Sequence, residues 1–462
     1  MPKTACYICN FNGKEYVEKC ISSVLEQAQV NELFHLYLID NASTDGTVEC
    51  VKEKFGAIVE IIQNSVNLGG AGGFNVALKD AIAKKYDYVV LLDNDVTLAP
   101  DCISNLIRYM DEHADVGCAG AKIMIMDHPE YIQEFGVHLD FEHYGLIHDY
   151  FGEMDRGTEY VIESDCVASC ALIARISCLN QTNLFPTENF LYWDDLEFTY
   201  QIKLAGYKVV SLASAVVYHK GKKKEATDTA LGYYGMRNRV KFFSKYEKEE
   251  RLPHLCRNIL DDCFQFFFGN ALKGLHASNS SRMFALDDFV HKHYGKVDGY
   301  KIYSMDRKED KIKKIVENQK AVYIELPNKN DPILMKCVGT LCRRLDEVKN
   351  IGQVRIVLTQ DMEQDDIQEI LKCYYEKEAE YVHSINSNGI VFRPCLHVKD
   401  VTEDISPIIW IDQYLNCIKD NDDFKWIQSY PYIKEFFINI HYEWLMQGIL
   451  NERKRGYLTN EV

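Results

Sequence analysis

The sequence predicts an α/β fold, with a helix-flanked sheet in the first half of the chain and a second α/β region near its end. In the first ~120 residues, short apolar runs alternate with segments of helical periodicity, which is typical of α/β units. The runs that we interpret as strands span residues 4–9, 34–39, 58–62 and 88–92. Three further strand-like runs, at 322–326, 354–358 and 390–393, alternate with helical segments and predict the second region.

The length of 462 residues suggests two or three domains. We predict a catalytic domain over residues 1–225, a mostly helical and basic segment over 226–300, and a C-terminal α/β domain of unknown role over 301–462. Between residues 220 and 257 there are eleven Lys or Arg against five Asp or Glu, although the whole chain has a net charge of −17. An anionic partner would therefore be met by this local basic stretch.

Composition excludes several classes of protein. A net charge of −17 argues against nucleic-acid binding, which needs clustered positive charge. Sixteen irregularly spaced cysteines and the lack of a secretory signal predict reduced thiols and a cytoplasmic location. Cys6 and Cys9 form a CxxC, but they fall in a predicted buried strand without a second pair, so a metal or redox role is disfavoured. No apolar stretch approaches the ~18 residues of a membrane-spanning helix.

Acidic side chains follow the predicted strand ends. Asp93, Asn94 and Asp95 come directly after a strand, and Asp40 ends another. Mg²⁺ and Mn²⁺ take oxygen ligands and commonly bridge carboxylates to nucleotide phosphates. Ligands of open α/β sheets bind at the carboxyl ends of the strands. A turn without a ligand is the alternative, since Asp and Asn favour turns.

A glycine-rich loop over residues 67–73 is predicted to open a helix spanning about 74–85. Such a loop lets backbone amides approach an anion closely. It is not a dinucleotide fingerprint, because Asn75 stands where the third glycine is required, and it lacks the Gly-Lys-Ser/Thr of a P-loop. A tight turn alone is the alternative.

A second acidic motif, Trp193-Asp194-Asp195, begins a predicted helix that ends near Gly206. Carboxylates in a first helical turn can simply complement the helix dipole, or one of them can accept a proton from a hydroxyl group. His219 follows a further strand-like run, where a histidine is more often structural unless the fold brings it to a metal.

Together, these motifs resemble the inverting glycosyltransferases of family 2, which have the GT-A fold, over roughly residues 1–245. The resemblance implies that Asp40 recognises the nucleotide base, that Asp93 and Asp95 bind Mn²⁺ or Mg²⁺ with a contact from His219, and that Asp195 is the general base. The remaining donor-side residues are expected to be Asn10, Asn67, Gly69, Gly70, Gly72, Gly73 and Asn94. Those expected on the acceptor side are Trp193, Asp194, Arg237 and Arg239.

Within the family, the chain is most similar to bacterial galactofuranosyltransferases, and rhamnosyltransferases share much of the pattern. The likeness is carried by residues 67–74, 193–195, 218–219 and 233–239. Val167 and Ala168 stand where those galactofuranosyltransferases have paired tryptophans, and Val137 stands where a glutamate is expected. The motifs therefore leave the acceptor open.

The sequence thus predicts a metal-dependent inverting glycosyltransferase of cell-surface polysaccharide synthesis. It would move a sugar from a UDP- or dTDP-linked donor, with UDP-galactofuranose favoured, to a glycan or a polyprenyl-diphosphate glycan. A dTDP-rhamnose-using rhamnosyltransferase is one alternative, and a non-catalytic glycan-binding or scaffolding protein is another. A sugar-nucleotide-forming nucleotidyltransferase is disfavoured, because residues 10–14 lack its glycine-rich basic loop.

Two partner surfaces are also predicted. The basic stretch would meet the anionic acceptor or the inner membrane face, with a solvated charged face as the alternative. An apolar helical stripe near the end of the chain is interpreted as core or as a contact in a homo-oligomer. It consists of Ile433, Phe436, Phe437, Ile440 and Trp444.

Overall fold

The computed structural model describes residues 3–27, 34–157, 160–220, 229–273, 276–302, 311–326, 328, 330–358, 362–375, 377–385, 389–401 and 408–455. The chain divides into two compact units. Unit 1 comprises Met1–Asn258, Ser281–Tyr303 and Trp444–Val462, and unit 2 comprises Ile259–Ser280 and Ser304–Glu443. Each unit is built around its own sheet.

Unit 1 contains a ten-stranded mixed sheet. Eight of its strands lie in the order β10-β12-β6-β11-β4-β1-β2-β3, while β5 pairs with β12 and β7 pairs with β6. Four neighbouring strands at one end of this order are parallel: β1 (Thr4–Asn10), β2 (Phe34–Asp40), β3 (Val59–Gln63) and β4 (Tyr88–Asp93). The remaining strands are β5 (Val96–Leu98), β6 (Val116–Ile125), β7 (His128–Glu134), β10 (Val161–Ser164), β11 (Ala171–Arg175) and β12 (Lys208–His219).

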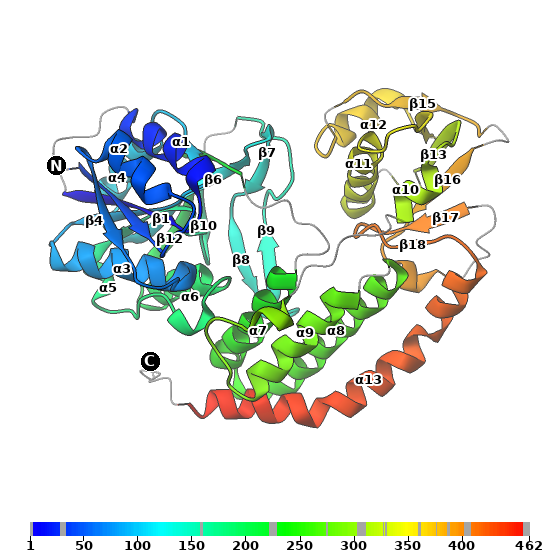
Figure 1. Ribbon diagram of the computed structural model, residues 1–462. Helices are drawn as coiled ribbons and strands as arrows, with labels where there is room; N and C mark the ends of the chain where they lie inside the picture. Colours follow the sequence, from blue (N-terminus) through cyan, green and yellow to red (C-terminus); the bar gives the residue numbers. More distant parts are fainter. Residues whose placement is uncertain are drawn as a thin grey trace. The chain divides into compact units, whose positions relative to one another are not determined.

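Helices cover both faces of this sheet (Figure 1). One face packs against α1 (Lys14–Leu25), α2 (Thr47–Phe55) and α4 (Cys102–Glu112). The other packs against α3 (Gly69–Ala83), α5 (Ile176–Leu179) and α6 (Asp194–Leu204). In β1, Cys6 and Ile8 join the first core and Ala5 and Tyr7 the second, because successive side chains of a strand point to opposite faces.

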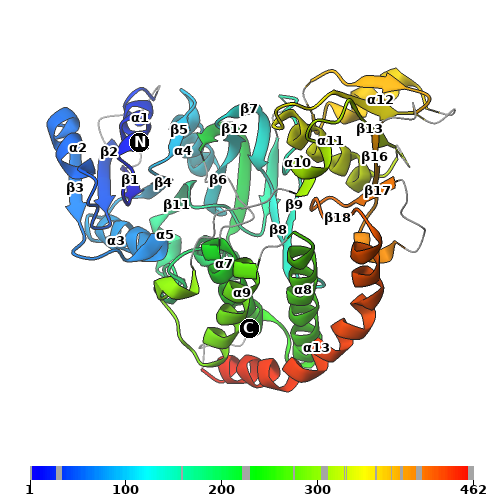
Figure 2. The same cartoon turned by 45° about the vertical axis from the view of Figure 1, so that its right-hand side comes forward.

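A helical region follows the sheet, as predicted, and Figure 2 shows its helices from a second direction. It comprises α7 (Thr229–Tyr246), α8 (Leu252–Lys273) and α9 (His276–Val290), with one-turn helices η1 (Thr187–Asn189), η2 (Glu249–Arg251) and η3 (Gly299–Lys301) elsewhere in unit 1. A separate hairpin is formed by β8 (Val137–Asp140) and β9 (Gly145–His148). The division between the units falls inside α8, α9 and the long α13 (Asn421–Arg453).

Unit 2 contains a six-stranded sheet of order β15-β14-β13-β16-β17-β18, parallel except for β18. Its strands are β13 (Ala321–Glu325), β14 (Gln353–Val357), β15 (Glu380–Val382), β16 (Ile390–Pro394), β17 (Ile408–Ile411) and β18 (Cys417–Ile418). Its helices include α10 (Lys311–Val316), α11 (Pro332–Asp346), α12 (Gln364–Leu371) and the one-turn η4 (Val398–Asp400). The predicted second α/β region is thereby confirmed.

One predicted boundary is wrong. The helix expected from about residue 74 begins at Gly69, so most of the glycine-rich segment is helical rather than an open loop. The predicted helix end is correct, since Gly206 adopts a left-handed φ of 89° just after α6. No helix among the described residues is long and apolar enough to cross a membrane.

Candidate active site

The parallel register of β1, β2 and β4 aligns polar residues at one edge of the sheet. Asn10 lies opposite Asp40, and Cys9 lies opposite Asp93. The Asn10 Nδ2 donates to Asp40 Oδ1 at 3.0 Å, and the Asn94 Nδ2 donates to Asn10 Oδ1 at 2.6 Å. Asp40 is buried and also accepts from the backbone N–H of Ser43 at 3.0 Å. Three of the predicted donor-side residues therefore form one hydrogen-bonded row.

Strand pairing also brings together the three predicted metal ligands. In the antiparallel pair of β5 and β12, His219 lies opposite Val96, which places it beside Asp95. One ligand atom each from Asp93, Asp95 and His219 lie within 4.8 Å of one another, and His219 Nε2 is 3.2 Å from Asp95 Oδ1. Two carboxylates and an imidazole fit Mn²⁺ or Mg²⁺, with the nitrogen ligand better suited to Mn²⁺.

In this cluster, burial and the neighbouring charges shift the pKa values of Asp93 and His219. Burial, followed by the charge of Asp95, raises the pKa of Asp93 to about 7, against the opposing effect of His219. Burial alone would lower the pKa of His219, but its hydrogen bond to Asp95 and the nearby carboxylates raise it overall. Two carboxylates this close favour a positive charge between them.

The predicted base lies close to this cluster. The Asp195 carboxylate accepts from the backbone N–H of Ser169 at 3.2 Å and from that of Leu196 at 2.9 Å. The adjacent Cys170 carbonyl accepts from the backbone N–H of Asp93 at 3.1 Å. Residues 169–170 therefore connect the predicted base to the predicted metal ligands.

Asp194 has different surroundings from Asp195. Its side chain is buried, and a Cβ added to Gly70 would lie 3.5 Å from Asp194 Oδ2. Burial and the charge of Asp195 raise the pKa of Asp194 well above its ordinary value. Burial also raises the pKa of Asp195, although the backbone N–H groups of Ser169 and Leu196 oppose that rise.

Three of the four glycines of α3 are required by packing. Gly69 has a φ of +75°, and a Cβ there would lie 2.2 Å from the carbonyl oxygen of Phe190. A Cβ at Gly73 would lie 2.5 Å from Cys9 Sγ and 2.7 Å from Asn41 Nδ2, and one at Gly72 would lie 2.4 Å from Leu68 Cβ. Asn67 Oδ1 accepts from the Gly69 N–H at 2.8 Å. Because neighbouring atoms come this close to the glycines, the start of α3 packs directly against the strand ends.

The structure does not bring the side chains of Trp193, Arg237 and Arg239 to the carboxylates. The Trp193 ring is buried against Phe242 and Phe243 of α7. The Arg237 guanidinium is fully buried and donates to carbonyl oxygens that include Asn189 at 2.9 Å and Gly295 at 3.0 Å. Arg239 donates to the carbonyls of His143 and Tyr144 in the β8–β9 hairpin. Their hydrogen bonds support the fold.

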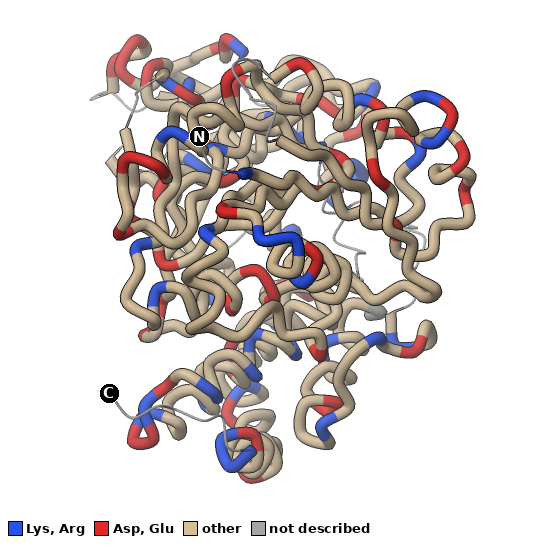
Figure 3. The backbone as a smooth tube through the Cα atoms, turned by 90° about the vertical axis from the view of Figure 1, so that its left-hand side faces the viewer, with Lys and Arg blue, Asp and Glu red and all other residues tan. Residues whose placement is uncertain are grey.

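The basic stretch is only partly described. Lys222, Lys223 and Lys224 lie outside the described residues. Of the others, Lys220 pairs with Asp127 at 2.8 Å, and Lys245 pairs with Glu197 at 2.7 Å. Figure 3 shows basic and acidic segments interspersed along the described chain.

Several site residues carried no local signal in the sequence. Gln133 of β7 lies 2.8 Å from His219 Nδ1, and Ser169 precedes β11. Gln133 reaches the site because β7 pairs with β6, which pairs in parallel with β12. Ser169 reaches it because β11 pairs antiparallel with β4. Asn41 was more accessible to prediction, because it directly follows β2; its Nδ2 donates to the Gly69 carbonyl at 2.9 Å.

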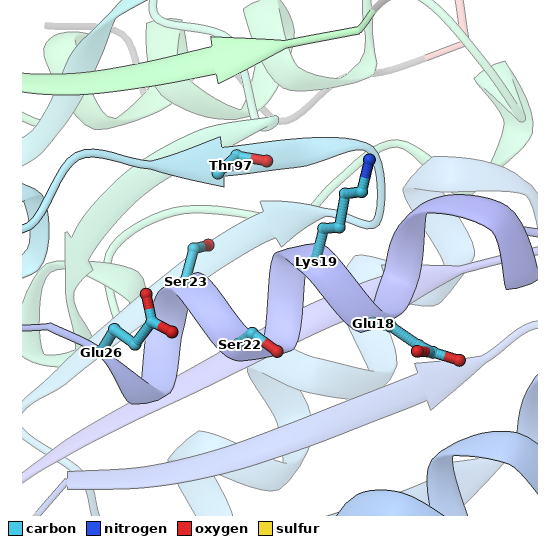
Figure 4. A pocket seen from close by; sticks show the side chains of 6 residues that line it. All are labelled: Glu18, Lys19, Ser22, Ser23, Glu26 and Thr97. Carbon is cyan, nitrogen blue, oxygen red and sulfur yellow. The ribbon is translucent and has the colours of Figure 1, made fainter.

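A shallow hollow of about 340 Å³ lies on α1 and β5 (Figure 4). It is lined by Glu18, Lys19, Ser22, Ser23, Glu26 and Thr97. It shares no residue with the carboxylate cluster, so it is not part of the candidate active site.

An open α/β sheet with carboxylates gathered at its strand ends defines a ligand-binding enzyme domain. Residues 6–178 match the family model described as Glycosyl transferase family 2. The match covers strands β1 to β11 of the sheet and both Asp40 and the Asp93–Asp95 pair.

Relatives by sequence are also glycosyltransferases. Over 112 residues the chain is 33% identical to the abequosyltransferase RfbV of Salmonella typhimurium, which covers 24% of this chain and 33% of that protein. Over 315 residues it is 21% identical to an uncharacterized glycosyltransferase of Haemophilus influenzae, covering 66% of this chain and 89% of that one. These matches support a transferase.

Two solved structures show distant similarity. The mannosyltransferase PcManGT from Pyrobaculum calidifontis, in complex with GDP-Man and Mn²⁺, has 17% identity and a TM-score of 0.40 over 52% of this chain and 63% of that chain. Residues 1–349 of Staphylococcus aureus TarS, in complex with UDP-GlcNAc, have 17% identity and a TM-score of 0.38 over 63% of this chain and 92% of that chain.

Proposed function

We propose that the protein is a metal-dependent inverting glycosyltransferase that uses a nucleotide-sugar donor. The observation that carries this proposal is that two consecutive residues connect a candidate cation site to a candidate proton acceptor. The cluster of Asp93, Asp95 and His219 can hold a divalent cation, and residues 169–170 link it to the carboxylate of Asp195. A binding module needs no such proton acceptor beside a cation site.

The row formed by Asn10, Asp40 and Asn94 is the proposed site for the nucleoside, with Asp40 accepting from the base. Asn67 and the glycines of α3 would lie along the donor. We favour UDP-galactofuranose, and dTDP-rhamnose is the alternative donor. The sequence motifs at residues 67–74, 193–195 and 218–219 support this choice.

A divalent cation held by Asp93, Asp95 and His219 would supply positive charge against the leaving diphosphate. Asp195 takes the proton from the acceptor hydroxyl as that oxygen attacks the anomeric carbon from the face opposite the leaving group. The N–H groups of Ser169 and Leu196 hold the carboxylate in one orientation. One displacement on the opposite face inverts the anomeric configuration.

The proposed acceptor is a glycan or a polyprenyl-diphosphate glycan in cell-surface polysaccharide synthesis. RfbV and TarS, which is named a poly(ribitol-phosphate) β-N-acetylglucosaminyltransferase, support this class by their names alone. Asp194 is the residue we place nearest the acceptor. Peripheral contact with an anionic membrane and self-association are further proposals.

The test is nucleoside diphosphate release from UDP-galactofuranose and dTDP-rhamnose in the presence of an acceptor glycan, with Mn²⁺, Mg²⁺ or excess EDTA. We expect release with one donor and one or both metals, and none with EDTA. Asp93→Asn and Asp95→Asn should abolish it. Asp115→Asn is the matched control, because this exposed carboxylate pairs with the exposed Lys208 at 2.9 Å. Release that resists EDTA, or near-native activity of the Asp93 and Asp95 variants, would refute the metal site.

A further inference from the structure

The turn directly before α6 has an unusual backbone. Phe190, Tyr192 and Trp193 have φ values of 66°, 63° and 63°, in the region that favours glycine. Bulky side chains are disfavoured there by steric contact with the backbone. Such a conformation persists only where neighbouring groups hold it. The next two residues of the chain are Asp194 and Asp195.

Asn238 of α7 holds this turn. Its Nδ2 donates to the carbonyl oxygens of Asn189 at 3.0 Å, Leu191 at 2.8 Å and Tyr192 at 2.9 Å. Arg237 Nε donates to Asn238 Oδ1 at 3.0 Å, which directs the amide NH₂ toward the turn. One fully buried amide therefore lies within hydrogen-bonding distance of three carbonyls of the distorted segment, which share its two N–H hydrogens.

The other side of the turn is closed by α3. The carbonyl oxygen of Phe190 lies where a side chain at Gly69 would be, and the Phe190 ring stacks on Tyr234 of α7 at 5.6 Å between centroids. The turn is therefore fixed between the start of α3 and α7, with the carboxylates immediately after it.

We propose that Asn238 is a positioning residue of the transferase: through the turn at 189–193 it sets where Asp194 and Asp195 point. Arg237 assists by orienting the Asn238 amide. This inference rests on the proposed function. Asn238 is buried and touches no expected substrate, so its effect on the reaction passes through Asp195. From the sequence, Arg237 and Arg239 of the motif at residues 233–239 were expected on the acceptor side. In this proposal the motif acts from the protein interior instead, without touching the acceptor.

The first test compares Asn238→Ala and Asn238→Asp with Ser244→Ala. Asn238→Asp keeps the size and the Arg237 contact but removes the NH₂ donor. Ser244 lies on the same helix, is fully buried, and donates to the Val240 carbonyl at 2.7 Å, which lies outside the turn at residues 189–193. Both Asn238 variants should lose about 100-fold in kcat, the effect of a misplaced reacting group. KM for the donor should stay unchanged, as should the thermal shift with Mn²⁺ and nucleoside diphosphate.

Ser244→Ala should lower the melting temperature without lowering kcat. Near-native kcat in either Asn238 variant would overturn the inference, as would an equal loss in Ser244→Ala. A double-mutant cycle adds a second criterion. In the Asp195→Asn background, Asn238→Ala should cost little further rate, and a full, multiplicative loss would contradict a role through Asp195.

A third readout needs no turnover. Hydrogen exchange of the amides between residues 189 and 195 should be faster in Asn238→Ala than in Ser244→Ala, and unchanged exchange would overturn the inference. If the native protein transferred no sugar while this exchange increased as expected, the proposed function would fail and the restraint of the turn by Asn238 would stand.

Discussion

Asp194 and Asp195 are consecutive residues with different roles in our proposal, because their carboxylates have different neighbours. Asp195 accepts two backbone N–H bonds and lies near the cation site, whereas Asp194 is buried beside Gly70. Adjacent side chains at a helix start diverge by about 100°. A single substitution at each position therefore separates the base from its neighbour.

Asp195→Asn should lower kcat by roughly 10²–10⁴-fold, the usual contribution of a positioned base, because the amide keeps the shape but cannot take a proton. Donor and metal affinity should change little. Steady-state transfer kinetics with Asp194→Asn alongside measure this directly. If Asp194→Asn lost the rate and Asp195→Asn kept it, the base would be Asp194.

At the scale of single residues, the sequence predicted which residues lie near the strand ends better than it predicted what each residue does. Asp40, Asp93 and Asp95 were accessible because each ends or directly follows a recognisable strand. Arg237 was not, because a buried arginine that donates to carbonyls and one that binds a phosphate look alike in a sequence. Gln133 was missed because the parallel pairing of β6 with β12, far apart in the chain, is what brings β7 toward His219.

At the scale of the elements, the start of α3 is a place where an added side chain collides with its neighbours. Gly69→Ala should destabilise the protein by more than about 1–2 kcal/mol, because it adds a left-handed penalty to a collision with the Phe190 carbonyl. Gly70→Ala should not, since its Cβ meets only an ordinary contact at 3.5 Å. Urea unfolding of the two variants compares them, and equal stability would contradict the packing argument.

The contact between α6 and α7 contains a buried ion cluster. Glu197 is 1% exposed and pairs with Lys245 at 2.7 Å and Lys241 at 3.6 Å. Burial raises the pKa of Glu197, but the two ammonium groups outweigh it and lower the pKa below its ordinary value of 4.5. The contribution to stability is therefore present above pH 4.5 and is lost as the pH falls through the lower folded-state pKa.

Glu197→Gln should accordingly cost up to about 3–5 kcal/mol at neutral pH, because Lys245 loses its carboxylate at 2.7 Å, while Lys241 keeps its ion pair with Glu188 at 2.8 Å. Its free energy of unfolding should also fall less steeply below pH 4.5 than that of the native protein. Denaturant unfolding at several pH values measures both effects. A native-like pH dependence in the variant would mean that other carboxylates control acid stability.

The parallel strands and covering helices of unit 1 were predictable because hydrophobic periodicity is local. The predicted strand at 34–39, for example, differs from β2 by one residue. The start of α3 was misplaced because glycine has a low intrinsic helix propensity. Close packing of α3 against β1 and the turn at residues 189–193 nevertheless requires glycine in the first turns of this helix. The partners of β10, β11 and β12 depend on contacts far apart in the chain.

For the whole molecule, the end of α13 is part of unit 1. Leu445 and Ile449 are fully buried, Glu452 accepts from the Tyr294 hydroxyl at 2.6 Å, and Arg453 donates to the carbonyls of Lys245 and Glu247 at 2.7 and 2.8 Å. A catalytic fragment that ends near residue 300 would lack all of these contacts.

A chain ending at residue 443 should therefore melt well below one ending at residue 455, and it should lose thermal stabilisation by donor and Mn²⁺. Losing each buried Leu or Ile side chain alone costs about 2–5 kcal/mol. Circular dichroism melts of the two truncated chains, with and without ligands, test this. Equal melting temperatures and equal ligand shifts would show that unit 1 is complete without residues 444–455.

The position of residues 444–455 in unit 1 also has a consequence for biosynthesis. The ribosome completes residues 1–303 before it makes the 140 residues that separate them from this segment. At about 5–20 residues per second, translation of these 140 residues takes on the order of ten seconds. During that time the surfaces around Tyr294 and Phe289 are not yet covered by residues 444–455. A transcript broken anywhere in that interval yields a chain that has every proposed catalytic residue but lacks the buried contacts of Leu445, Ile449 and Glu452, so we expect it to be less stable than the full chain.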